Sequence, residues 1–406
     1  MSTNISVPIH LIRLSGVISL DQIDSWTPSA EGSLAFVVHR DARFSMCCEA
    51  IAIAKVRLLK DLCRSISVAI SYTFPKTDST GFVDPARFEL LGGLFGLALL
   101  MYSTSVVDST GAELRESLVR ALWASVLKRG GQFGDGKKQQ VLFRDPDYTI
   151  PSCLRDTARN KFPYSGAFVT LLRNIGRSLF GQRNPGIGNS PDASPSNFGS
   201  STRETEALIF LYEASLNAHE HARGDTAHSP AEGIRGIIVE KYLFDSHASL
   251  NSRDGIPEPL RQFMYRSFRR SAPPLMAISL TVCDLGPGIH NTVNSAELED
   301  EWDRLKRAVP PGTSRKAESD LERGQGFAKM FRSAQQLGAF VFIKSADVLA
   351  YSDFSYGCEM ESESPLCRWP ETSNVSLGSS LTLVWPLTKT SIEQYDLFPS
   401  SDRGDG

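Results

Sequence analysis

Apolar residues recur at two different spacings along this chain, which predicts a mixed α/β protein. Runs of β-branched and aromatic residues at positions 34–39 and 67–74 enclose a segment, 50–64, in which the apolar residues follow helical spacing. That order predicts a strand, a crossover helix and a parallel strand. Further helices are expected in this half of the chain over residues 85–103, 113–128 and 166–180.

The pattern is sharper in the second half of the chain. Helical spacing is found at 204–222, 258–269 and 297–308, and another helix is expected to begin after Gly326. Strand-like apolar runs lie between these helices or follow them, at 234–243, 277–284, 340–344, 348–354 and 380–385.

A segment rich in Gly, Pro, Ser and Asn separates the two halves. Residues 182–202 contain almost no large apolar side chain, which is typical of a linker. We therefore expect a separate N-terminal α/β domain over residues 1–181, whose element order is similar to that of STAS-type regulatory domains. A second domain is expected over 203–387, followed by a flexible tail over 388–406. A chain of 406 residues is long enough for two cores.

Composition and charge exclude several classes of protein. The chain is 41% apolar and 22% charged with a formal net charge of -3, which is ordinary for a globular protein and gives no general attraction to nucleic acid or membranes. The beginning of the chain lacks the pattern of a secretory signal, so we expect a cytoplasmic protein. Seven cysteines without a C-x-x-C pair favour reduced, structural thiols. Residues 131–137 approach a phosphate-binding loop, but Lys138 replaces the required Ser or Thr.

Three groups of residues carry candidate chemistry, and the first is on the helix after the linker. Glu213, Asn217 and His221 follow one another at four-residue steps, so they share one helix face. The side-chain oxygen of Asn217 is a suitable magnesium ligand, and a carboxylate one turn earlier is placed to activate a water. The same spacing also occurs on ordinary solvated helix faces.

The second group ends the strand at 277–284. Asp284 is followed by Gly286, Gly288 and Ile289. A carboxylate at a strand end accepts a hydrogen bond from an exocyclic amine such as that of adenine, and the glycines let the backbone approach a planar base. An ordinary turn has the same pattern.

The third group precedes the helix that begins near residue 326. It consists of Arg323, Gly324, Gln325, Gly326 and Phe327. Glycines before a helix expose backbone N–H groups to an anion, which the helix dipole also attracts, so phosphate would fit there. A flexible loop is the alternative interpretation.

The order of the three groups resembles the ATP-binding domain of the GHKL superfamily of gyrase, chaperone, histidine-kinase and mismatch-repair ATPases. The resemblance spans residues 203–387, and its motifs match Glu213 and Asn217, then Asp284, Gly286 and Gly288, then Gly324 and Gly326. It implies a Bergerat-type two-layer α/β sandwich with a mixed sheet. It also implies that Asn217 binds Mg²⁺, that Asp284 holds the adenine amine, and that the second glycine group contacts the phosphates of ATP.

The resemblance also assigns two further segments. Ser379 or Ser380 stands where the family often has a Thr or Ser beside the adenine, with Ser380 the chosen candidate. Residues 291–322 would form the ATP lid, as long polar loops in compact domains often do. Phe327 replaces the usual Leu.

Three functions are compatible with these residues. The first is a magnesium-dependent ATPase, with Glu213 as catalytic residue, that couples nucleotide state to conformational change or to binding of a protein partner, including a second copy in a homodimer. The second is a protein kinase of the histidine-kinase or anti-sigma type. The third is a nucleotide-sensing module without turnover.

Overall fold

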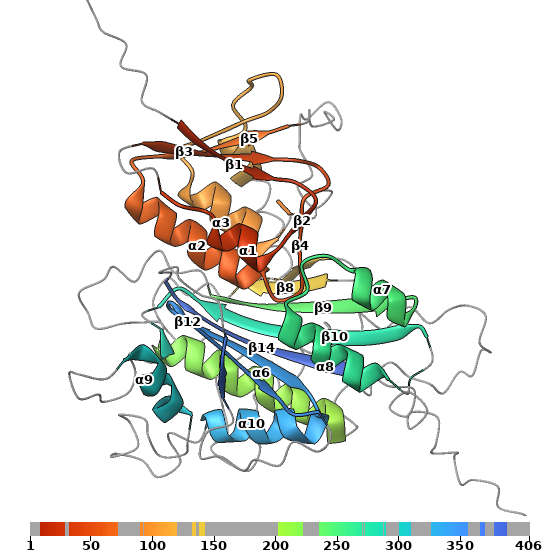
Figure 1. Cartoon of the computed structure of the whole chain (residues 1–406). Coiled ribbons are helices and arrows are strands. Elements are labelled where there is room, and N and C mark those ends of the chain that lie inside the picture. Colours follow the sequence, from red (N-terminus) through yellow and green to blue (C-terminus); the bar gives the residue numbers. More distant parts are fainter. Residues whose placement is uncertain are drawn as a thin grey trace, which may run out of the picture.

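The computed structural model describes residues 9–28, 32–71, 90–91, 93–119, 132–134, 138–142, 202–221, 235–269, 271, 273–286, 288–289, 300–309, 326–355, 366–369 and 377–387. These residues form a mixed α/β structure built in four layers (Figure 1). A small sheet lies at the top of the view, N-terminal helices lie beneath it, a large sheet follows, and the last layer is helical. Within the described residues, no helix combines the length and the apolar composition needed to cross a membrane.

The small sheet is parallel, with strand order β1-β3-β5-β6. The helix α2 (Glu49–Leu62) connects β3 (Ser33–Val38) to β5 (Ile66–Ile70), and these strands pair in parallel. The predicted strand, crossover helix and strand are therefore confirmed. The remaining elements of this part are β1 (Ile9–Leu14), β2 (Val17–Ile18), α1 (Leu20–Asp24), β4 (Arg43–Phe44), α3 (Leu94–Tyr102) and β6 (Ser105–Val107).

The large sheet has eight strands in the order β13-β12-β11-β14-β10-β9-β8-β7. Its pairings are all antiparallel, so the expected mixed sheet is wrong for the described strands. The short turn between β11 and β12 shows one reason, since a two-residue connection can only reverse the chain. The strands are β7 (Gln132–Gly134), β8 (Lys138–Leu142), β9 (Gly236–Phe244), β10 (Leu275–Asp284), β11 (Phe340–Ser345), β12 (Val348–Asp353), β13 (Cys367–Arg368) and β14 (Ser379–Leu387).

Helices cover both faces of the large sheet (Figure 1). On one face lie α6 (Thr202–His221), α9 (Glu301–Ala308) and α10 (Gly326–Leu337). Their apolar side chains form a core with Val282, Val341 and Leu383 of the sheet. On the other face α8 (Glu258–Phe268) and the N-terminal helices pack, and α7 (His247–Ser252) precedes α8.

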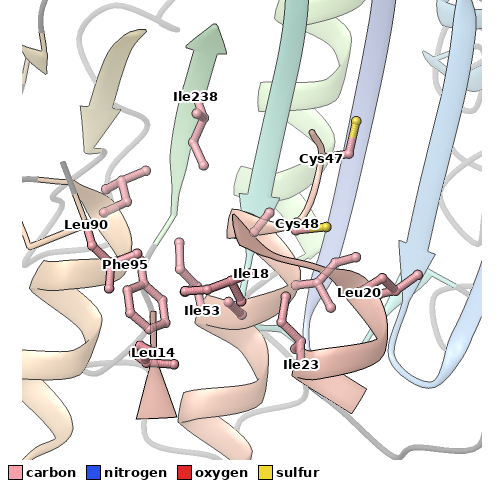
Figure 2. Close-up of a cluster of buried hydrophobic side chains, with 14 of the residues drawn as sticks. Leu14, Ile18, Leu20, Ile23, Cys47, Cys48, Ile53, Leu90, Phe95 and Ile238 are labelled. Carbon is pink, nitrogen blue, oxygen red and sulfur yellow. The ribbon is translucent and has the colours of Figure 1, made fainter. Parts of the chain in front are cut away.

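The second core is shared by the N-terminal layers and the large sheet. Figure 2 shows Ile238 of β9 pointing into a cluster with Phe95 of α3 and Ile53 of α2. The same cluster includes Phe340 of β11 and Val384 of β14. Every residue of β10 except Met276 is buried, which is the pattern of a strand covered on both faces.

A buried polar network also joins the N-terminal helices to the large sheet. Glu49 accepts a hydrogen bond from the backbone N–H of Phe95 at 3.2 Å, and Gln140 of β8 accepts one from the N–H of Leu94 at 2.7 Å. Lys138 forms ion pairs with Glu49 and with Glu240 of β9. The first N–H groups of α3 are thus satisfied by side chains from distant segments.

A hairpin in the first half of the chain belongs to the large sheet, although the expected linker separates it from the other strands of that sheet. Residues 132–134, which belong to the segment that approaches a phosphate-binding loop, pair with residues 138–142 in a hairpin. That hairpin precedes the expected linker at 182–202, yet β8 pairs with β9, which follows the linker. The linker up to residue 201, the helix at 166–180 and the tail at 388–406 lie outside the described residues.

Most predicted elements of the second half are confirmed within a few residues. The helices expected at 204–222 and 258–269 are α6 and α8, and the helix expected after Gly326 is α10. The five predicted strands correspond to β9, β10, β11, β12 and β14. The helix expected at 297–308 is described from Glu301 as α9.

Candidate functional site

A pocket opens between α6 and the sheet, at the end where β10 stops and β14 begins. It has an empty volume of about 400 Å³, which includes space open to solvent. Segments far apart in the sequence contribute to its walls, which are mostly apolar with a few polar groups. Such a composition is typical of small-molecule sites. The lining residues are Ala214, Asn217, Ala218, Val282, Asp284, Gly288, Ile289, Phe327, Ser379 and Leu381.

Asp284 supplies the charge in this pocket. It is the last residue of β10, it pairs with Ser379 of β14, and only 7% of its surface is exposed. Burial raises the pKa of its carboxyl from 3.8 to about 6, while the N–H of Gly286 and the charges of Lys344 and Arg235 oppose that rise. The carboxylate is therefore mainly ionised at neutral pH and can accept a hydrogen bond from a ligand.

Two glycine-containing turns hold Asp284 in place. The N–H of Gly286 donates to Asp284 Oδ1 at 2.8 Å, and the N–H of Gly378 donates to the carbonyl of Gly286 at 2.9 Å. Gly378 has a φ of +80°, and a Cβ atom there would lie 2.1 Å from the backbone carbonyl oxygen of Asp284. Only glycine allows this approach of the two turns.

Asn217 lies on the opposite wall, about one turn before the end of α6. Its side-chain nitrogen Nδ2 is buried and has no hydrogen-bond partner among the described residues. A Cβ atom on Gly326 would lie 3.2 Å from both amide heavy atoms of Asn217. The absence of a side chain at Gly326 therefore lets the first turn of α10 approach the polar face of α6.

Glu213 is one helical turn before Asn217 and does not line the pocket. Its Oε1 atom accepts a hydrogen bond from Lys329 Nζ of α10 at 3.0 Å. The side chain of Glu213 is 8% exposed, whereas that of Lys329 is 43% exposed. The carboxylate is thus held beside Gly326, between the two helices.

The structure brings most of the predicted site residues together. Asn217, Asp284, Gly288, Ile289 and Phe327 line one pocket, although they come from three separate sequence motifs. Three further predicted residues adjoin the lining residues. The N–H of Gly286 donates to Asp284, and Gly326 lies beside Asn217 and Glu213. Arg323, Gly324 and Gln325 lie outside the described residues, as does the side chain of His221 at the end of α6.

Ser380, the serine expected beside the adenine, does not line the pocket. Side chains alternate between the faces of a strand, and in β14 it is Ser379 and Leu381 that face the pocket. Ser380 pairs with Cys283 on one side and with Lys344 on the other, and its buried Oγ has no hydrogen-bond partner among the described residues. The serine at the site is therefore Ser379.

Sequence reasoning missed several charged residues near the pocket. Lys329 and Lys344 are single lysines in apolar segments, which was their only visible signal. Arg235, directly before β9, lies with its Nη1 atom 2.8 Å from Nδ1 of His219, and both residues are buried. Buried charges of this kind are frequent near functional sites.

Comparison with protein-family models, with curated proteins and with solved structures finds no match to this chain.

Proposed function

We propose that this pocket binds Mg-ATP in the manner of the GHKL ATP-binding domain. The observation that carries the proposal is Asp284, a buried carboxylate that is mainly ionised at neutral pH and lines a pocket with Asn217 of α6. The N–H of Gly286 donates to one oxygen of this carboxylate, and a ligand donor would further offset the cost of burying the charge. The exocyclic amine of adenine is such a donor.

The residues present fit each part of the ligand. Asp284 and Ser379 would bind the base, and the backbone at Gly288 would lie against its plane. Asn217 Oδ1 would hold Mg²⁺, and the orphaned Nδ2 atom of the same amide is available to a phosphate oxygen. Bound Mg²⁺ would neutralise charge on the phosphates. The first N–H groups of α10, at Gly326 and Phe327, would bind phosphate oxygens.

The fold is compatible with the proposal. A layer of α6, α9 and α10 packs on strands β9, β10, β14, β11 and β12, with the pocket between helices and sheet, and this layering supports the proposal of a Bergerat-type sandwich. We propose that fold for residues 203–387, with antiparallel pairing throughout its described strands. The helix α9 would then belong to the ATP lid, together with the rest of residues 291–322.

For turnover we propose that Glu213 orients and deprotonates the water that attacks the terminal phosphate. The residue is a carboxylate one helical turn from the proposed magnesium ligand. Nucleotide state would then be coupled, through α9 and the lid, to a conformational change that a protein partner or a second copy of the chain recognises. We propose a cytoplasmic setting, since ATP is supplied there.

A nucleotide-sensing module without turnover is the second candidate. The hydrogen bond that Lys329 donates to Glu213 favours this candidate, because a carboxylate already paired with a lysine is less able to deprotonate the attacking water. In that case the pocket binds Mg-ATP, and binding itself is the signal.

Calorimetry with Mg-ATP tests the binding step, and wild-type protein is expected to bind about 10- to 100-fold more tightly than Asp284→Asn. Labelled ATP then separates the candidates. Free phosphate indicates an ATPase, label on a partner indicates a kinase, and retained intact ATP indicates a sensing module. Absence of binding by the folded wild-type protein would refute the proposal.

A further inference from the structure

Lys344 is a buried lysine near the end of β11. Only 1% of its surface is exposed. Alternation along β11 puts Lys344 on the same face as Phe340 and Phe342, which belong to the core shared with the N-terminal helices. The lysine therefore lies on the face of the sheet opposite the pocket.

The amine of Lys344 nevertheless contacts the backbone that forms the pocket rim. Its Nζ atom donates to the carbonyl oxygen of Leu377 at 2.6 Å and lies 3.3 Å from that of Gly378. The N–H of Gly378 donates a hydrogen bond to the carbonyl oxygen of Gly286, and Gly378 also lies against the backbone of Asp284. One side chain thus holds the turn against which the Asp284 segment is fixed.

The charges around Lys344 come from several elements. Burial lowers the pKa of its amine to about 7, and the nearby charge of Asp284 opposes this fall, as do Asp347 and Cys283. Lys55 of α2 acts in the opposite sense. In return, Lys344 and Arg235 both favour the ionised form of Asp284. The lysine thus acts on Asp284 through its charge and through the position of the turn.

We propose that Lys344 is a positioning residue for the base end of the nucleotide pocket, holding the turn at residues 377–378 against Asp284 from the far side of the sheet. This inference rests on the proposed function. It predicts that Lys344 matters for the base and not for the phosphates, because the proposed phosphate ligands are on α6 and α10.

The test compares Lys344→Met with Lys138→Met, which removes a partly buried lysine from the large sheet at β8, away from the pocket. Binding of adenosine and of magnesium tripolyphosphate is measured separately, and the Asp284 carboxyl is titrated by carbon NMR without ligand. Lys344→Met is expected to lose at least about tenfold in adenosine affinity. Tripolyphosphate affinity should be unchanged, and the pKa of Asp284 should rise.

Lys344→Gln keeps an N–H donor without the charge, so it is expected to recover part of the adenosine affinity while the pKa of Asp284 stays raised. It also serves if the methionine variant does not fold. Equal adenosine affinity and an unchanged Asp284 titration in a folded Lys344 variant would overturn the inference. If wild-type protein binds no adenosine, the proposed function fails instead, and the Asp284 titration still tests the positioning role.

Discussion

Lys329 Nζ donates a hydrogen bond to Glu213 Oε1 at 3.0 Å, linking α10 to α6 directly beside Gly326. A second carboxylate of α6 makes a similar link, because Ser333 Oγ donates to Glu206 Oε2 at 2.6 Å. The two bonds are alike in joining the same helices, but only Glu213 is one turn from Asn217. This similarity provides a matched control for the catalytic proposal.

Replacing Glu213 by Ala is expected to preserve nucleotide affinity and to abolish turnover. General-base catalysis contributes about 10²- to 10⁴-fold, so kcat should fall by that factor while Kd stays within about threefold. Steady-state phosphate release and calorimetry measure the two quantities. Glu206→Ala should lose a helix-to-helix bond without losing turnover, and equal kcat losses in the two variants would assign Glu213 a purely structural role.

Replacing Asp284 by Asn is expected to weaken ATP binding and to stabilise the fold. Loss of a hydrogen bond to a charged group costs about 1.5–3 kcal/mol of binding free energy, or about 10- to 100-fold in affinity. A rise in carboxyl pKa from 3.8 to about 6 corresponds to about 3 kcal/mol of destabilisation at neutral pH, which the neutral amide would relieve in part. Urea unfolding and calorimetry check both signs. A variant that is less stable and binds normally would contradict both assignments.

The pKa of Asp284 also sets a pH dependence. The ionised carboxylate is a stronger acceptor for the adenine amine than the protonated acid, so adenosine affinity should fall as the pH is lowered through about 6. The contribution of Asp284 to stability should change in the opposite sense. Because its folded pKa is above the unfolded value of 3.8, the native state binds more protons between these values, and stability rises as the pH falls through about 6.

This dependence is measured by adenosine titrations and urea unfolding at several pH values between about pH 5 and about pH 8. Asp284→Asn is the reference for the stability curve, since its side chain does not titrate. A wild-type adenosine affinity that is constant down to about pH 5 would show that another group binds the base.

Replacing Asn217 by Ala is expected to weaken nucleotide binding only when magnesium is present, because the proposed role of its oxygen is to hold the metal. Affinities measured by calorimetry with Mg²⁺ and with EDTA should therefore converge between variant and wild type in EDTA. An equal loss under both conditions would mean that the buried amide contacts the nucleotide directly, which its orphaned Nδ2 atom allows.

The sequence predicted the direction of side chains best on helices, where residues four positions apart share one face. In α6 the four-residue spacing of Glu213 and Asn217 predicted their shared direction, and both lie toward α10. In β14 the sequence could not distinguish Ser379 from Ser380, because both serines are buried and alternation assigns them to opposite faces. An error of one residue in the assumed position of β14 therefore places Ser380 at the pocket in place of Ser379.

The hairpin of β7 and β8 was not predicted, and the two positions of β8 whose side chains the structure describes are polar. Lys138 and Gln140 face a core, but they are satisfied there by Glu49 and Glu240, which are distant in sequence. Hydrophobic periodicity detects apolar burial only, so a strand whose inward side chains are an amide and an amine is read as a loop. For the same reason the burial of Lys344 was not predicted, since its amine is satisfied by backbone carbonyls that are distant in sequence.

The pairing of β8 with β9 makes the order of synthesis matter. The hairpin leaves the ribosome long before residue 236, so the nascent N-terminal half carries an unpaired strand edge and an uncovered apolar helix layer until the second half arrives. Exposed edges of this kind recruit other strands. Cutting the gene near residue 182 would therefore yield two aggregation-prone fragments, whereas co-expression of the pieces would allow them to reassociate along β8 and β9.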